Sequence, residues 1–191
     1  PDYRGAAPIN WVIINGEKET GVTTFFINKK IDEGDVIDSV RVKINDGYSA
    51  GILHDKLMSV GAKLVLKTVN NIFTNTFSRQ KQIISDKDKL APKIDKELCK
   101  INLKKSSKEI VRLIKGLSPY PCAKLKFNNK YYKIIDCKKT DVNYSNKSTM
   151  FVENNKLYFK NFKNESIEIL ELQAEGKKIM KSSDFLRGNK L

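Results

Sequence analysis

The stretch that decides the fold reads P1-D-Y-R-G-A-A-P8, then T20-G-V-T-T-F-F-I27, then I31-D-E-G-D35. Pro8 suits the first turn of a helix, where its missing N–H costs nothing, and Gly16 can end that helix in a left-handed conformation. The β-branched and aromatic run Thr20–Ile27 predicts a buried strand. The first block therefore predicts a helix, and the acidic third block a turn that follows the strand.

Working outward, Val36–Ile44 alternates apolar with polar residues, which predicts a partly exposed strand near a sheet edge. An amphipathic helix is expected over Ser49–Phe73, packed on the sheet. Residues 76–97 are polar and interrupted by Pro92, so we predict a linker there. The apolar residues at helical spacing in the predicted helix are Ile52, Leu53, Leu57, Val60, Leu64, Val65 and Val69.

The remaining sequence predicts a capped helix from Ser107 to Gly116, followed by short strands and hairpin turns. This pattern indicates a small β-barrel, and one last helical turn is predicted after it at Ser183–Leu186. The five predicted strands are Ala123–Phe127, Tyr131–Cys137, Thr149–Glu153, Lys156–Phe159 and Ser166–Leu172.

Charge is distributed unevenly along the chain. Residues 1–75 carry nine basic and nine acidic side chains, so the whole net charge of +14 falls in residues 76–191. A compositional bias toward Lys would spread the charge evenly, whereas this asymmetry favours a polyanion-binding module attached to a neutral one. The composition, 40% apolar and 30% charged, is that of a soluble globular protein.

Several classes of protein do not fit the sequence. No apolar run approaches the roughly 20 residues that cross a membrane. Cys99, Cys122 and Cys137 are widely spaced, which suits reduced cytosolic thiols better than disulfides. His54 is the single histidine and lies in the predicted helix beside Asp55, so we interpret it as structural and expect no metal site.

The three opening blocks, in this order and spacing, resemble the catalytic core of the methionyl-tRNA formyltransferase family. The blocks S118-P-Y-P-C-A123 and G176-K-K-I-M-K-S-S-D-F-L-R-G188 resemble that family's C-terminal tRNA-binding domain. The resemblance implies an α/β plus β protein. Residues 1–75 would be the C-terminal part of a Rossmann-like formyltransferase domain, residues 76–97 a linker, and residues 98–191 an OB-like β-barrel that binds tRNA.

The family's catalytic Asn-x-His belongs just upstream of Pro1. We therefore expect this chain to be the C-terminal portion of a longer enzyme and to be inactive alone. In the family, an aspartate in the block that matches I31-D-E-G-D35 partners the catalytic histidine, and Asp32 takes that position. A carboxylate there would stabilise the imidazolium and could orient a proton-carrying water. In isolation, Asp-Glu-Gly-Asp is more often a solvated turn. Asp35 matches an acidic residue to which we assign no catalytic role.

The resemblance also implies binding residues. One loop resembles the family loop that surrounds the pterin of 10-formyltetrahydrofolate, and it comprises Asn28, Lys29, Lys30, Ile31 and Gly34. Pro1 would end a second segment that contacts the same co-substrate. The helix entry beside the site, which would face the substrate, comprises Tyr3, Arg4, Gly5, Ala6, Ala7 and Pro8. Small residues that only pack under a sheet would look the same.

Three groups of residues could bind tRNA. The block L90-A-P-K-I-D-K-E97 resembles a block of the family, and Lys93 and Lys96 occupy the positions of its two lysines. A solvated linker without a binding role explains these lysines nearly as well. In the barrel, aromatics interleave with Lys124 and Lys126, which fits a nucleic-acid groove or a core. The tail block contributes Lys177, Lys178 and Arg187, the most family-specific of these cations.

The resemblance implies transfer of a formyl group from 10-formyltetrahydrofolate to the α-amine of methionyl-initiator tRNA. The enzyme is expected to use no metal, to be a monomer and to be cytoplasmic. A folate-dependent formyltransferase acting on a small amine is one alternative, for which the basic tail would be superfluous. A non-catalytic RNA-binding fragment is the other.

Overall fold

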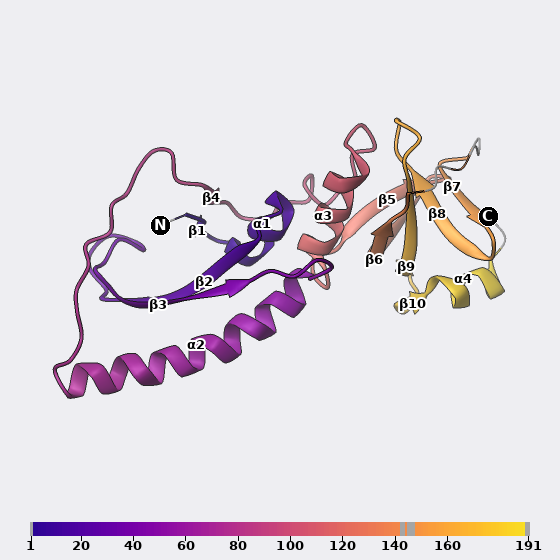
Figure 1. Cartoon of the computed structure of the whole chain (residues 1–191). Coiled ribbons are helices and arrows are strands. Elements are labelled where there is room, and N and C mark those ends of the chain that lie inside the picture. Colours follow the sequence, from indigo (N-terminus) through magenta and orange to yellow (C-terminus); the bar gives the residue numbers. More distant parts are fainter. Residues whose placement is uncertain (1, 142–143, 145–147, 190–191) are drawn as a thin grey trace.

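The computed structural model of the chain describes residues 2–141, 144 and 148–189. It has two parts that meet where α1 approaches α3, and a long segment runs from the end of α2 back past β1 to α3 (Figure 1). The first part contains β1 Arg4–Gly5, α1 Pro8–Asn15, β2 Glu19–Phe25, β3 Val36–Lys43 and α2 Ala50–Phe73.

Strands β2 and β3 form an antiparallel ribbon from Glu19–Lys43 to Phe25–Val36. Helix α2 covers one face of it, where the hydroxyls of Thr24 and Thr68 lie 2.9 Å apart. The prediction of a strand is confirmed, although the strand spans Glu19–Phe25 and ends two residues before the predicted Ile27. The prediction that this strand is buried is wrong. Its side chains alternate between half-buried and exposed, because the helix covers one face of the ribbon.

The long amphipathic helix is confirmed, and the hydroxyl of Ser49 caps it by accepting from the backbone N–H of Ile52 at 3.3 Å. Its apolar stripe is only partly covered. Leu53 and Leu64 are buried, whereas Val65 and Val69 are 50% and 42% exposed. Among the described residues, α2 packs mainly on the two strands of this ribbon, and part of its apolar stripe remains accessible.

The predicted linker is docked rather than free. Strand β4, Leu90–Ala91, pairs in parallel with β1, and Gln80 forms a bridge with Val36. Neither β1 nor β4 was predicted, because a strand of two residues has no periodicity to detect.

The second part contains a six-stranded sheet with the order β5-β6-β9-β8-β7, and β10 pairs with β9. Among the described residues β5 does not pair with β7, so the expected closed OB-like barrel is not confirmed. The outer edge of β5 instead meets the incoming chain, where Lys100 bridges Lys124. The elements are α3 Ser107–Leu117, β5 Ala123–Phe127, β6 Lys130–Lys139, β7 Met150–Glu153, β8 Lys156–Lys160, β9 Ser166–Ala174, β10 Met180–Lys181 and α4 Ser182–Gly188.

Helix α3 packs on this sheet and also joins the two parts. Its face toward the sheet buries Ile110, Ile114 and Leu117 in the main core. On the other side, the backbone carbonyl of Gly116 accepts a hydrogen bond from the side-chain amide of Asn10 at 2.7 Å. A Cβ on Gly116 would lie 2.5 Å from Ile14, so a glycine lets α1 and α3 approach closely.

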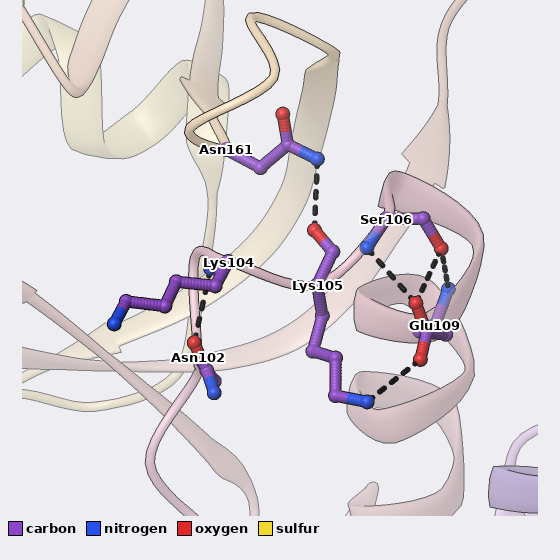
Figure 2. A network of polar contacts seen from close by, with 6 residues as sticks. All are labelled: Asn102, Lys104, Lys105, Ser106, Glu109 and Asn161. Atoms are coloured by element: carbon purple, nitrogen blue, oxygen red, sulfur yellow. Dashed lines mark hydrogen bonds and ion pairs between the residues drawn. The ribbon is translucent and has the colours of Figure 1, made fainter.

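The start of α3 is fixed by a network of polar contacts (Figure 2). The helix is capped by Ser106, one residue before the predicted Ser107, in a capping box with Glu109. Hydrogen bonds from Ser106 hold the pKa of Glu109 at about 2. The side-chain amide of Asn161 donates to the carbonyl of Lys105 at 2.9 Å, which ties the β8–β9 turn to the same point.

Candidate active site and basic groove

Asp32 lies in the turn between β2 and β3, with its side chain exposed. Its backbone is left-handed, with φ of 57°. Aspartate tolerates this conformation better than most residues, but it is still uncommon and carries strain. The carboxylate is thus presented at the surface of a turn whose shape must be maintained by other contacts.

Contacts within the turn account for part of that shape. The side chain of Asn28 accepts from the N–H of Lys30 at 2.8 Å and donates to the carbonyl of Glu33 at 3.3 Å. Lys30 and Glu33 form an ion pair at 3.2 Å. A Cβ on Gly34 would lie 1.5 Å from the carbonyl oxygen of Phe26, so only glycine fits there.

The docked segment after α2 supplies further contacts. The amide of Gln82 donates to the carbonyls of Asp32 at 3.1 Å and Gly34 at 2.7 Å. The guanidinium carbon of Arg79 lies 4.1 Å from the centre of the Phe26 ring, a cation–π contact at the base of the turn. Sequence reasoning missed both Gln82 and Arg79, and nothing in a polar stretch distinguishes Gln82 from Gln80.

The second predicted segment, Tyr3–Pro8, is held by the same long segment. Gly5 has φ of 135°, and a Cβ there would lie 2.3 Å from the carbonyl oxygen of Ala91. The N–H of Ala7 donates to that carbonyl at 3.1 Å, and the indole N–H of Trp11 donates to the carbonyl of Pro92 at 2.8 Å. The space beside Gly5 is therefore filled by strand β4, which is a structural reason for a small residue, as the packing alternative in the sequence analysis allowed.

Side-chain contacts reinforce this pairing. The hydroxyl of Tyr3 donates to Glu17 at 2.5 Å, and the ammonium of Lys89 donates to the same carboxylate oxygen, also at 2.5 Å. Burial raises the pKa of Tyr3, and its bond to Glu17 adds to the rise. Hydrogen bonds from Lys89 and then Tyr3 lower the pKa of Glu17. Beside them, Arg4 pairs with Asp88 at 3.2 Å, with both side chains largely shielded from solvent.

A groove with more basic than acidic side chains, called the basic groove below, lies in a cavity of about 470 Å³ in the second part. Its lining includes Lys96, Lys100, Lys124, Lys133 and Tyr131, together with Glu97 and Glu175, and Lys100 pairs with Glu97 at 2.6 Å. Lys124 and Lys133 stand directly opposite each other in the β5–β6 ladder. Like charges in that position destabilise a sheet, which favours an anionic ligand between them. The structure thus brings Lys96 and Lys124 together and adds Lys100, which sequence reasoning missed.

The other predicted cations do not line this groove. Lys93, Lys126 and Lys178 are exposed and do not line it. Lys177 lines a neighbouring cavity that shares Tyr131 with the groove. Arg187 forms an ion pair with Asp184 on α4.

Other predicted residues lie at the surface, and one lies outside the residues that the structure describes. Pro1 lies outside the described residues, and Lys29 and Ile31 are exposed in the Asp32 turn. His54 is exposed on α2, with its Nδ1 atom 3.1 Å from Asp55. Within the described ranges, no three His, Cys, Asp or Glu side chains gather as a metal site would require. No helix in the described part of the chain is both long and apolar enough to cross a bilayer.

Comparison with known proteins agrees with both parts of the fold. The formyl transferase family model matches residues 1–69, and the model of the formyl transferase C-terminal domain matches residues 93–190. Methionyl-tRNA formyltransferase of Azobacteroides pseudotrichonymphae is 44% identical over 99% of this chain and 62% of its own length. That of Phocaeicola vulgatus is 42% identical over 98% of this chain and 61% of its own length. The chain thus spans about three-fifths of these curated relatives.

Solved structures share the architecture. The N-formyltransferase from Helicobacter canadensis, in complex with folinic acid and dTDP-3-aminofucose, is similar with a TM-score of 0.69 and 26% identity, over 91% of this chain and 62% of that one. HypX from Aquifex aeolicus with tetrahydrofolic acid shares the fold with a TM-score of 0.75 and 18% identity, over 97% of this chain and 33% of that one. From the two family models, the curated relatives and the shared fold, we conclude that this chain belongs to the formyl transferase family.

Proposed function

We propose that the protein containing this chain transfers a formyl group from 10-formyltetrahydrofolate to the α-amine of methionine on initiator tRNA. Relatives that are 44% and 42% identical to this chain are named methionyl-tRNA formyltransferase. The observation that favours a tRNA substrate is the basic groove, in which Lys124 faces Lys133 across a ladder and Lys96 and Lys100 line the same cavity.

In this reaction the amine attacks the formyl carbon to form a tetrahedral species with a negatively charged oxygen. The carbon–nitrogen bond to the folate then breaks, and the proton of the amine is transferred to the departing nitrogen. Such a step needs hydrogen-bond donors at the oxyanion and a group that handles the proton. We assign Asp32 to the second task, as the carboxylate that partners the catalytic histidine implied by the family resemblance.

The Asp32 turn is a suitable place for the folate. A pterin presents several donors and acceptors on one edge, which backbone groups of a loop can meet. The segment Ile27–Asp32 is exposed, so its backbone is accessible to a planar ligand. Its polar side chains need not be specific, because the backbone would supply the recognition.

The basic groove would hold the tRNA and direct its aminoacylated end toward the Asp32 turn. The chain that lines the groove at Lys96 is the continuation of the strand paired with Gly5. Binding of tRNA in the groove would thereby be linked mechanically to the segment beside the site, which converts affinity into position.

The test is the formylation of charged initiator tRNA by the full-length protein, followed on acid gels, with tRNA affinity measured separately. Asp32→Asn should remove almost all turnover and leave tRNA affinity unchanged, whereas Asp35→Asn, in the same turn, should retain activity. Near-normal turnover of Asp32→Asn would end the assignment.

Two other functions make different predictions in the same assays. A sugar-amine formyltransferase, such as the Helicobacter canadensis relative with its bound dTDP-3-aminofucose, would formylate a nucleotide-linked amine and show no salt-dependent affinity for tRNA. A purely RNA-binding protein would bind tRNA without affinity for the folate.

A further inference from the structure

The hydrogen bonds from the linker to the Asp32 turn suggest a role for Gln82. Asp32 adopts φ of 57°, and Gly34 lies so close to Phe26 that no side chain would fit. A strained turn persists only when its surroundings over-determine it. Within the turn, side-chain contacts come from Asn28 and from the Lys30–Glu33 pair, whose residues are exposed or half-exposed. The backbone N–H of Phe26 also donates to the carbonyl of Asp35 at 2.9 Å and closes the base of the turn.

Gln82 contributes a contact of a different kind. Its single side-chain amide nitrogen bonds to two carbonyls, those of Asp32 and Gly34, at 3.1 Å and 2.7 Å. A primary amide has two N–H donors in a fixed plane, so both can be used at once. The two bonds fix the backbone on either side of Glu33, and therefore the direction in which the Asp32 side chain leaves the turn.

The position of Gln82 is itself fixed. Two residues earlier, the backbone of Gln80 exchanges two hydrogen bonds with Val36, at 2.8 Å and 2.9 Å. One residue before that, Arg79 stacks on Phe26. The segment 79–82 thus lies along the end of the β2–β3 ribbon in a set register.

We propose that Gln82 is a positioning residue of the active site, which holds the turn Asp32–Gly34 in the conformation in which Asp32 acts. The inference rests on the proposed function, because it takes Asp32 as the catalytic carboxylate. Gln82 does not touch the reacting atoms. It acts through the backbone of Asp32, so its loss should misplace the carboxylate rather than remove it.

The experiment compares Gln82→Met with Gln80→Met in the full-length protein. The second variant makes the same substitution at an exposed side chain whose residue is held through its backbone. Formylation kinetics, tRNA affinity, and amide hydrogen exchange of residues 28–35 are measured for both. Because a displacement of about 1 Å can cost up to a hundredfold in rate, Gln82→Met should lower kcat by about ten- to a hundredfold. Its tRNA affinity should be unchanged, and its turn should exchange faster. Gln80→Met should match the wild type.

A double-mutant cycle separates positioning from general destabilisation. If Gln82 acts through Asp32, Gln82→Met should cause no further loss of turnover in an Asp32→Asn background. A wild-type kcat for Gln82→Met, or an equal loss in both backgrounds, would overturn the inference. If Asp32→Asn itself keeps normal turnover, the proposed role of Asp32 fails. Amide exchange then decides separately whether Gln82 holds the turn: faster exchange supports that contact, and unchanged exchange refutes it.

Discussion

Removal of one lysine from the β5–β6 ladder should change stability and RNA affinity in opposite directions. Lys124 and Lys133 are directly opposite in the antiparallel pair, where like charges cost about 0.2–1 kcal/mol. Lys124→Gln should therefore raise the free energy of unfolding by up to about 1 kcal/mol. If the groove binds tRNA phosphates, the same change should lower the salt slope of binding by about 0.9.

The slope sets the size of the effect on affinity. Between 50 and 200 mM salt the concentration rises fourfold, so a slope change of about 0.9 alters the ratio of wild-type to variant affinity by about 3.5-fold over that range. Affinity is measured by titration with labelled initiator tRNA at several salt concentrations, and stability by urea unfolding. The control is Lys63→Gln on the exposed face of α2, which should change neither quantity.

The double variant sharpens the test. Once Lys124 is neutral, Lys133→Gln should give no further gain in stability, because the repulsion is already relieved. A Lys124→Gln protein that is less stable and keeps the wild-type salt slope would refute the reasoning, since the lysine would then serve the fold and not the RNA.

Two further predictions concern the docked linker. Gly5→Ala should lower the free energy of unfolding by at least about 1–3 kcal/mol from backbone strain alone, and by more because the added Cβ meets Ala91 at 2.3 Å. Gly47→Ala, at φ of 87° with nothing within 4 Å of the added Cβ, controls for the strain in the same urea assay, and equal losses would contradict the close contact. The pKa of Glu17 is lower in the folded protein than the value of about 4.5 in the unfolded chain. The contacts of Glu17 with Lys89 and Tyr3 therefore stabilise the fold fully above the unfolded pKa. This stability is lost as the pH falls through the folded pKa. The free energy of unfolding of the wild type should therefore exceed that of Glu17→Gln by about 0.2–1 kcal/mol at pH 6. The difference should shrink as the pH falls below the unfolded pKa, and a pH-independent difference would refute the ion pair.

Local patterns predicted most of the regular structure. Helix α2 and strand β5 lie where the periodicity and turn residues placed them, because a stripe of apolar residues and a pair of asparagines at a turn act within one element. The closed barrel was not confirmed, since closure depends on which edges pair, and the edge of β5 is taken by Lys100. Burial of the β2 strand was also mispredicted, because burial depends on what covers each face.

The sequence by itself determined the family, the position of Asp32 in a turn between two strands, and the concentration of positive charge in residues 76–191. Only the tertiary structure decided that the predicted linker contacts the Asp32 turn and the segment at Gly5. Gln82 reaches Asp32 across 50 positions of sequence, and Ala91 lies against Gly5. Single hydrogen bonds and close backbone contacts between distant segments have no periodicity, so they become visible only when the chain is folded.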